Sequence, residues 1–318
     1  RQMCIRDRSK LVEQANHLSS HLMQANIKIN TTQSNSASAL SFDKEHIQLM
    51  TTRILQNADT QWGGFGNAPK FPQTFALQFL LRSDHLFKEE SALQHVLLSL
   101  DKMIQGGIYD HIGGGFSRYS TDGQWQAPHF EKMLYDNALL ISVLSEAYQI
   151  TKKESYRLVI QDTIQFLEME LSNGEGIYFA ALDADSEGVE GKFYTWSYDE
   201  LKALVPENLF AGFCAYYQVQ EKGNWEHTNI LWTQADYMIS RSEAFKQIKE
   251  KLFAVRAKRI RPALDHKIIL SWNALAITAL CKAAAALSDS QFIDKAITAM
   301  QWIETVSYTH LTLPTTPY

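Results

Sequence analysis

The chain has 318 residues, of which 45% are hydrophobic and 20% charged, and its formal net charge is -5. This balance predicts a large buried core in one or two domains and no electrostatic footprint for nucleic acid. No run of eighteen apolar residues occurs, so no membrane partner is expected. Cys4, Cys214 and Cys281 lack the spacing of a disulfide framework or a zinc site, which indicates a reducing compartment, and the expected location is the cytoplasm.

The two ends of the chain and its first forty residues differ from the rest. Residues 1–8 and 306–318 resemble translated adapter sequence, and we expect both to be non-native tails. Within 9–41, residues 9–29 have apolar positions at helical spacing, and a serine-rich linker follows. The sequence therefore predicts a helix and linker over 9–41 and one main domain over 42–305.

Within the main domain the pattern is helix after helix. Apolar residues at a period near 3.6 predict helices at 43–58, 73–87, 90–105, 129–150, 154–171, 198–205, 207–218, 236–258, 272–287 and 290–304. Only 176–196 is strand-like, and it predicts a small β-hairpin turned by a Gly-rich acidic loop. Short links alternate with long loops rich in glycine and aromatic residues, and no repeat of fixed period is visible. The expected class is all-α, a toroid of helical hairpins.

The segment 106–138, GGIYDHIGGGFSRYSTDGQWQAPHFEKMLYDNA, is the first candidate site. Glycines let a backbone approach a ligand closely, and long ordered loops often carry function. His111 and His129 have side chains that titrate near neutral pH, which suits the transfer of a proton. Epimerisation next to a carbonyl needs one group to remove a proton and another to return it, and two histidines could do both. Glu131 is a third catalytic candidate. The structural alternative is that each histidine bonds loop backbone.

Five residues of the same segment are candidates for substrate binding. Arg118 presents a planar fork for a carboxylate of a substrate, or for an internal ion pair with Glu131 or Asp136. Tyr119 and Trp125 could be platforms for sugar rings or ordinary core aromatics. Asp136 and Asn137 follow on the helix expected from residue 129, which would place His129 and Asp136 on one stripe.

Three alternating carboxylates, Asp183, Asp185 and Glu187, are expected to point to one face of an extended strand. Two carboxylates that flank a glycosidic bond suit hydrolysis, although at least one of these side chains could serve turn formation instead. The run resembles the start of an EF-hand loop, but Tyr194 stands where a bidentate glutamate is needed. We therefore predict no metal and no cofactor.

Two further stretches contribute substrate-binding candidates. GGFGNAPKFP at 63–72 is expected to be mostly architectural, with Lys70 facing a cavity. Trp272 and Asn273 lie near the start of an expected helix, from which they could contact hydroxyl groups at the mouth of a toroid. The alternative there is a loop fixed by an ion pair between Asp265 and Lys267.

Four blocks of sequence carry a resemblance to a known family. They are GGFGNAPKFP, the 106–138 segment, ALDADSEGVEGKFYTW at 181–196 and DHKIILSWNAL at 265–275. In this order they resemble the thioredoxin-domain-containing proteins similar to spermatogenesis-associated protein 20. The resemblance implies an (α/α)6 toroid of the six-hairpin glycosidase type, related to N-acylglucosamine 2-epimerases and cellobiose epimerases, behind an N-terminal thioredoxin-like domain. This chain contains no CxxC, so a redox role does not carry over, and the resemblance implies a truncated toroid. His266 stands where the family usually has aspartate, and Ala274 where it usually has glycine.

Three functional hypotheses follow, and whether the chain is an enzyme is left open. The first is a carbohydrate-active toroid with sugar isomerase or epimerase activity. The second is a glycoside hydrolase that uses the carboxylates at 183, 185 and 187. The third is a non-catalytic scaffold that works with a thioredoxin-like domain. The expected partners are a sugar or sugar-like molecule and that domain, and we expect His111, Arg118, His129 and Asp183 to converge on one site.

Overall fold

The computed structural model describes residues 12–14, 16, 17, 19, 20 and 44–310, the last four of these without their side chains. The chain divides into two units, 1–47 and 48–318. The described residues of the first unit are short helical stretches within the expected helix 9–29 and the start of α3 (Lys44–Leu55). The expected tail 1–8, the linker 30–41 and residues 311–318 lie outside the described residues.

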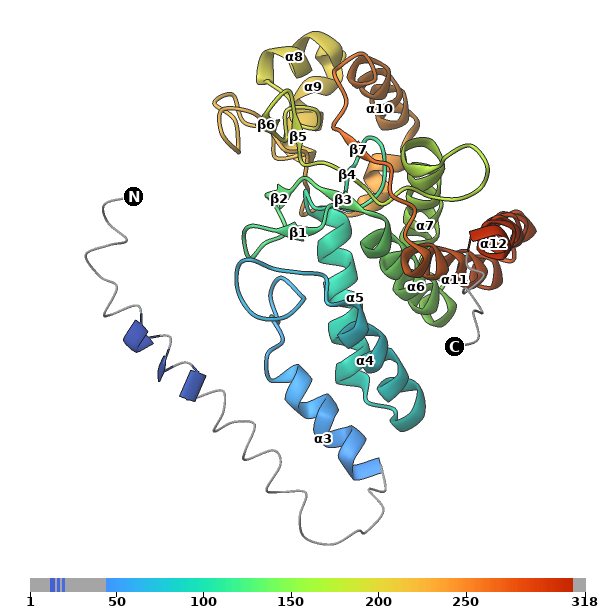
Figure 1. Cartoon of the computed structure of the whole chain (residues 1–318). Coiled ribbons are helices and arrows are strands. Elements are labelled where there is room, and N and C mark those ends of the chain that lie inside the picture. The colour runs from blue at the N-terminus through green and yellow to red at the C-terminus, as the bar shows by residue number, and fades with distance from the viewer. Residues whose placement is uncertain (1–11, 15, 18, 21–43, 311–318) are drawn as a thin grey trace, which may run out of the picture. The chain divides into compact units, whose positions relative to one another are not determined.

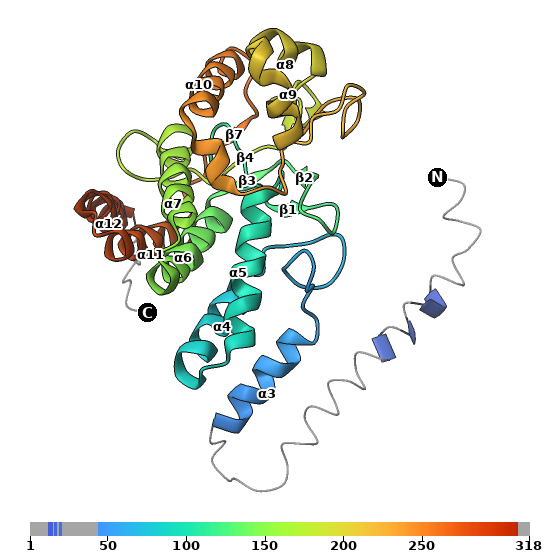
Figure 2. The same ribbon diagram turned by 180° about the vertical axis from the view of Figure 1, so that it is seen from behind.

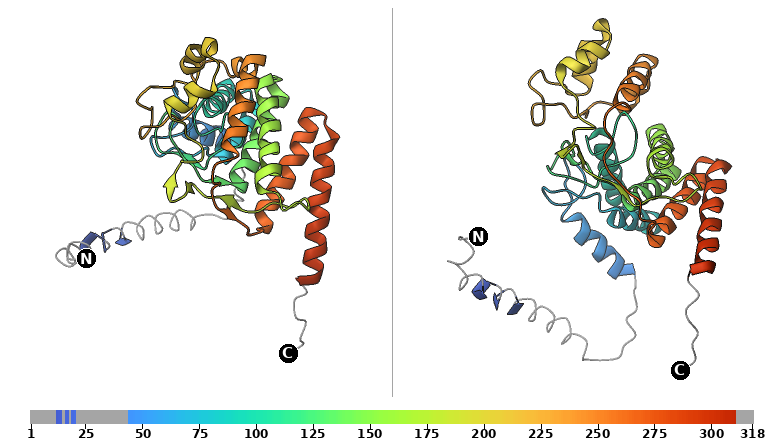
Figure 3. Two further views of the ribbon diagram at one scale, coloured as in Figure 1. Left: turned by 90° about the horizontal axis from the view of Figure 1, so that it is seen from above. Right: turned by 45° about the horizontal axis from the view of Figure 1, so that its top comes forward.

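Three helical hairpins form the core of the second unit (Figure 1). They are α4 (Thr74–Phe87) with α5 (Glu90–Gln105), α6 (Leu134–Thr151) with α7 (Glu154–Phe166), and α11 (Leu270–Leu287) with α12 (Ser290–His310). A π-helical turn, η1 (Leu167–Leu171), extends α7. Both α4 and α11 pack on α6, so the first helices of the three hairpins are neighbours. α12 packs on α11 at the edge of this group (Figure 3).

Helix α6 is the centre of this arrangement. It contacts α4, α7 and α11, and eleven of its residues are buried. A helix that packs on several neighbours needs apolar side chains around most of its circumference, as the sequence LLISVL within it provides. α11 is similar: among the described residues it is the one helix whose length and hydropathy would allow it to cross a membrane, a property shared with core helices.

A second group of helices lies between the last two hairpins in the sequence (Figure 2). It contains α8 (Tyr198–Leu204), α9 (Glu207–Tyr216), the 3-10 helix η2 (Tyr237–Arg241) and α10 (Glu243–Arg256). These elements enclose their own apolar cluster, which includes Trp196, Phe213, Tyr217 and Leu252. Ser197 caps α8 by accepting a hydrogen bond from the Glu200 N–H.

Short strands gather where α4, α6 and α11 begin. They are β1 (Tyr119–Ser120), β2 (Pro128–His129), β3 (Lys132–Met133), β4 (Ala181–Leu182), β5 (Asp185–Ser186), β6 (Val189–Glu190) and β7 (Leu264–Asp265). β1 pairs with β2, β5 with β6, and β4 lies between β3 and β7, all antiparallel. Segments more than a hundred residues apart in the sequence therefore meet at one end of the hairpins.

The predicted all-α class with paired helices is confirmed, and so is a small strand excursion, since β5 and β6 form a hairpin within 176–196. The helix expected at 129–150 was placed wrongly at its start: 128–129 and 132–133 are strands, and α6 begins at Leu134. The stripe expected to join His129 and Asp136 therefore does not exist. α12 continues to His310, beyond the expected end at 304.

Candidate functional site

A buried carboxylate, Asp110, holds the glycine-rich loop after α5. Its oxygens accept hydrogen bonds from Arg256 at 2.8 Å and Lys132 at 2.9 Å, and from the N–H groups of Ile112 and Gly113 at 3.0 Å each. Burial acts to raise the pKa of Asp110, but the two cations outweigh it and hold that pKa well below its usual range. A fully paired buried charge cluster of this kind fixes geometry, so this cluster positions the loop.

His111 follows Asp110 and is buried, with 3% of its surface exposed. Its Nε2 atom lies 3.1 Å from the Gly106 carbonyl oxygen, and its Nδ1 atom has no partner among the described residues. Burial, with the charge of Lys249, lowers the pKa of His111 to about 4. The ring is therefore neutral at pH 7, and it lines a cavity of about 390 Å³ between α7 and α10.

Strand β3 separates His111 from the other catalytic candidates. The Lys132 side chain reaches Asp110, next to His111, whereas the preceding Glu131 accepts a hydrogen bond from Arg118 at 3.0 Å. Neighbouring residues of an extended chain point to opposite faces. The two histidines therefore do not share one site, and the expectation that His111 converges with the others is wrong.

His129 belongs to the Glu131 face. Its Nδ1 atom lies 2.7 Å from a carboxylate oxygen of Glu190 on β6, and its Nε2 atom lies 3.8 Å from one of Glu131. Its ring stacks on Tyr119, with 5.0 Å between centroids, and Tyr119 stacks on Phe71 at 4.7 Å. This face thus carries a half-exposed histidine between two carboxylates and beside a stack of aromatic rings.

Asp136 is the group whose acidity is altered most on this face. It lies in the first turn of α6, and its buried Oδ2 atom has no partner among the described residues. Burial raises the pKa of Asp136 to about 7; the Glu131 charge adds to this, and the Tyr135 hydroxyl and the Arg118 guanidinium oppose it. A carboxyl group with a pKa near neutrality can donate or accept a proton in a reaction.

The strand register brings the predicted carboxylates of 181–187 to the same face. Lys132 pairs with Leu182, so Glu131 and Asp183 come next to each other where the two strands diverge. Asp183, Asp185 and Glu187 are exposed while the residues between them are buried, as expected for side chains on one face. Asp185 pairs with Glu190, the partner of His129.

Trp272, in the first turn of α11, completes the group of predicted residues at this face. Its ring lies 4.8 Å from that of Tyr135, and both rings are half-buried. They pack on a small apolar cluster formed by Met133 and Ala181. We refer to Arg118, Tyr119, His129, Glu131, Tyr135, Asp136, Asp183 and Trp272 as the acidic face.

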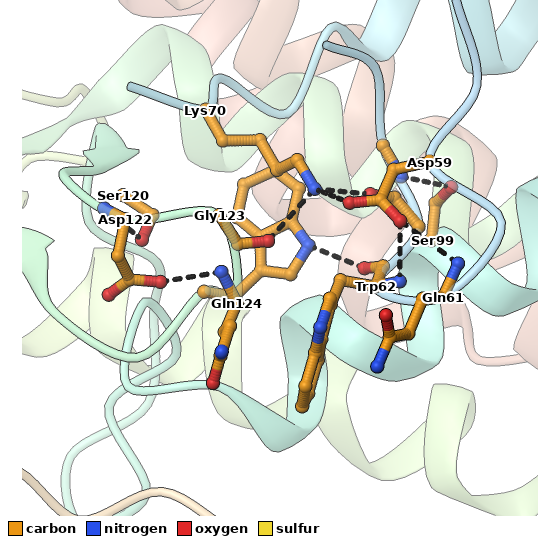
Figure 4. A network of polar contacts seen from close by, with 12 residues as sticks. Asp59, Gln61, Trp62, Lys70, Ser99, Ser120, Asp122, Gly123 and Gln124 are labelled. Atoms are coloured by element: carbon orange, nitrogen blue, oxygen red, sulfur yellow. Dashed lines mark hydrogen bonds and ion pairs between the residues drawn. The ribbon is translucent and has the colours of Figure 1, made fainter. Parts of the chain in front are cut away.

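Two predicted binding residues are structural instead. Lys70 is fully buried, and its ammonium group donates to Asp59 at 2.6 Å and to the carbonyls of Gly63 and Gly123 at 2.9 Å each (Figure 4). Trp125 lies beneath this network, fully buried, with its indole N–H bonded to a backbone carbonyl at 2.8 Å. Lys70 has therefore used its three donors within the protein, and Trp125 presents no ring to a ligand.

Asn137 and Asn273 require the same correction. Both are fully buried, and each side-chain amide makes three hydrogen bonds to backbone groups. Neither amide is available to a substrate hydroxyl.

Three members or neighbours of the acidic face were not among the predicted site residues: Tyr135, Glu190 and Phe71. Tyr135 adjoins Asp136, and a helix start at residue 134 would have placed it in the first turn with Asp136. Glu190 is brought to His129 by the β5–β6 hairpin, for which the Glu187–Gly188 turn was a visible signal. Among the described residues, no group of three or more His, Cys, Asp or Glu side chains could hold a metal ion.

Comparison with known proteins identifies longer relatives. An uncharacterised protein of Caenorhabditis elegans, B0495.5, is 34% identical over 284 residues, which is 77% of this chain and 39% of that protein. Human spermatogenesis-associated protein 20 is 33% identical over 285 residues, 77% of this chain and 36% of that protein. The chain is thus homologous to spermatogenesis-associated protein 20 and spans less than two fifths of the length of these relatives. No protein family model matches the chain.

Several solved structures with a similar course of the chain are carbohydrate enzymes. A sugar epimerase from a ruminal bacterium aligns over 82% of this chain and 86% of its own, with 13% identity and a TM-score of 0.39. A family 76 glycoside hydrolase (mannosidase) from Bacteroides thetaiotaomicron aligns over 73% and 43%, with 9% identity and a TM-score of 0.41. Because identities and scores are this low, the chemistry of these enzymes does not transfer to this chain by resemblance.

Proposed function

We propose that the acidic face is a carbohydrate-active site that carries out acid–base chemistry on a sugar. The observation that carries the proposal is the raised pKa of Asp136, which is about 7. The carboxylate of Glu131 lies near Asp136 and accepts a hydrogen bond from Arg118. Glycoside hydrolysis uses two carboxyl groups, one as the acid and the other as the base or nucleophile.

In such a reaction Asp136 donates its proton to the glycosidic oxygen as the bond from that oxygen to the anomeric carbon breaks. Glu131 takes a proton from the attacking water, so charge and protons balance over the two groups. The stacked rings of Tyr119 and Phe71 offer an apolar surface for a sugar ring, and Trp272 offers another. Asp183 is a second candidate for the base.

Epimerisation by two histidines has less support than hydrolysis. His111 is neutral and buried beyond β3, so His129 would need Asp136 as its proton-transfer partner. A non-catalytic sugar-binding scaffold is the remaining alternative.

We also propose that this chain works together with a thioredoxin-like domain, as the resemblance of the four sequence blocks implies, and that the full-length protein is located in the cytoplasm. Fractionation of cells that express the tagged full-length protein tests the location.

The test is a screen of the purified protein against oligosaccharides and reducing sugars, with both reducing-end release and C2 stereochemistry measured. Asp136→Asn keeps the shape of the side chain and removes its acidity, so turnover should fall by about a hundredfold or more. Asp294→Asn, an exposed change on α12, is the matched control and should leave turnover unchanged. Turnover by Asp136→Asn equal to that of the wild type, or no reaction with any sugar, would overturn the proposal. Altered C2 stereochemistry without reducing-end release would replace hydrolysis by epimerisation.

A further inference from the structure

The cavity that His111 lines lies on the side of β3 opposite the acidic face. It measures about 390 Å³, opens to solvent, and is lined by α7, η1, η2, α10 and the His111–Gly114 loop. This volume is in the range of cavities that hold small molecules. None of the proton-transfer steps proposed for Asp136 uses it.

Cations outnumber carboxylates among the residues that line this cavity. The cations are Arg241, Lys246 and Lys249, and the carboxylates are Asp162 and Glu250. Arg241 forms an ion pair with Asp162, which leaves Glu250 as the only other lining carboxylate for the two lysines. The cavity therefore has an excess of positive charge.

Lys249 is the partly buried cation that lacks a counter-ion; Lys246 has no ion pair among the described residues either, but it is exposed. Lys249 makes no hydrogen bond and no ion pair with the described residues. A desolvated ammonium group without a partner is unfavourable, and a bound anion would relieve that cost. Burial, with the nearby charge of Arg241, lowers the pKa of Lys249 to about 8, which agrees with an ammonium group that lacks an anionic partner.

Arg241 is held in a fixed position beside Lys249. Asp162, which pairs with it, also accepts hydrogen bonds from the hydroxyls of Tyr109 at 3.0 Å and Tyr237 at 3.3 Å. Arg241 is thus held by its ion pair with Asp162, and its guanidinium group lies at the wall of the cavity.

His111 contributes its ring to the wall of the same cavity. The Gly106 carbonyl can only accept a hydrogen bond, so the Nε2 atom of the neutral ring carries the proton. The Nδ1 atom is then an unprotonated acceptor, buried and without a partner among the described residues. Because this atom is not accessible from the cavity, His111 contributes a neutral wall, and the charge of the cavity comes from its cations.

We propose that this cavity binds a small anion, whose carboxylate or phosphate group contacts Lys249 and Arg241. Hydroxy acids and sugar phosphates both carry such a group. The proposal is independent of the acidic face, because it concerns other residues on the other side of β3.

Calorimetric titration of the whole chain with gluconate, glucose 6-phosphate, inorganic phosphate and glucose tests the proposal. Gluconate or glucose 6-phosphate should bind saturably, glucose should not bind, and the tighter of the first two identifies the anionic group. Lys249→Met should weaken binding at least tenfold. Lys251→Met makes the same charge change on the same helix outside the cavity and should have no effect.

A second measurement uses the unmodified protein and so does not depend on the folding of a variant. Acetylation of Lys249 by a soluble reagent, followed by mass spectrometry, should slow at least threefold when the bound anion is present, while acetylation of Lys251 stays constant. The proposal is overturned if no anion binds, if both lysine variants weaken binding equally, or if the bound anion leaves the acetylation of Lys249 unchanged.

Discussion

Asn137 and Asn273 occupy the same position in α6 and α11 and make the same three hydrogen bonds. Each is the fourth residue of its helix, within LYDNAL and LSWNAL. The side-chain oxygen of Asn137 accepts from the Phe116 N–H at 2.7 Å, and that of Asn273 accepts from the Tyr178 N–H at 3.0 Å. Each amide nitrogen donates to the carbonyl of that same residue and to the carbonyl four residues earlier. The two hairpins are thus built on one local plan.

Each of these asparagines ties the first turn of its helix to a segment that is distant in the sequence, at Phe116 or Tyr178, which gives a prediction. Asn137→Ala and Asn273→Ala should each lower the free energy of unfolding by about 1–3 kcal/mol, because buried backbone groups lose their partners. Urea denaturation measures this cost. Asn57→Ala, at an exposed position, is the control and should change stability by less than about 0.5 kcal/mol. If Asn137→Ala or Asn273→Ala lowered the free energy of unfolding as little as Asn57→Ala does, the shared role of the two asparagines would be contradicted.

The sequence predicted the hairpins well because their signal is local. The boundaries of α4 and α5 agree with the expected ranges to within one residue, since apolar periodicity determines an amphipathic helix. The repeat between LYDNAL and LSWNAL escaped the search for a fixed period because α8, α9 and α10 intervene between the two hairpins.

The candidate site was predicted only in part, because its arrangement depends on distant pairing. The helix expected from residue 129 begins at Leu134, since Lys132 and Met133 pair with β4, about fifty residues later. That pairing sends Lys132 toward Asp110 and Glu131 toward Arg118, and so separates the two histidines. No local pattern carries this information.

The charge cluster around Asp110 should be among the most sensitive points of the fold. Asp110→Asn leaves Lys132 and Arg256 as buried cations without a counter-charge, and this should lower the free energy of unfolding by about 3–5 kcal/mol. Chemical denaturation measures the loss. Glu154→Gln, which breaks an exposed ion pair with Arg157, should cost less than about 1 kcal/mol. Equal costs for the two variants would show that the Asp110 cluster adds no more than a surface pair.

Asp136 should make the protein less stable as the pH rises. Its pKa of about 7 in the folded state exceeds the ordinary value of 3.8, so the folded protein holds this proton more tightly. The resulting stability is complete below about pH 4 and is lost between pH 4 and pH 7. Asp136→Asn should therefore be more stable than the wild type by up to about 4 kcal/mol at pH 8, and the difference should vanish near pH 4. Melting temperatures across this range measure it, with Asp294→Asn as the control, and a difference independent of pH would refute the assignment.

His111 should make the protein less stable as the pH falls, over a pH range that overlaps that of Asp136. Its pKa of about 4 in the folded state lies below the ordinary 6.5, so the unfolded protein takes up this proton first as the pH falls. The stability from the buried neutral ring is complete above pH 6.5 and is lost progressively down to pH 4, a change of up to about 3 kcal/mol. His111→Gln retains a hydrogen-bond donor for Gly106 but does not titrate, so its loss of stability on acidification should be smaller by that amount. The titration of Asp136 opposes this pH dependence of stability. The proteins with His111 and with His111→Gln are therefore best compared in an Asp136→Asn background, by urea denaturation between pH 4 and pH 7.5. Parallel pH profiles for the two would show that the imidazole of His111 is accessible to protons in the folded state.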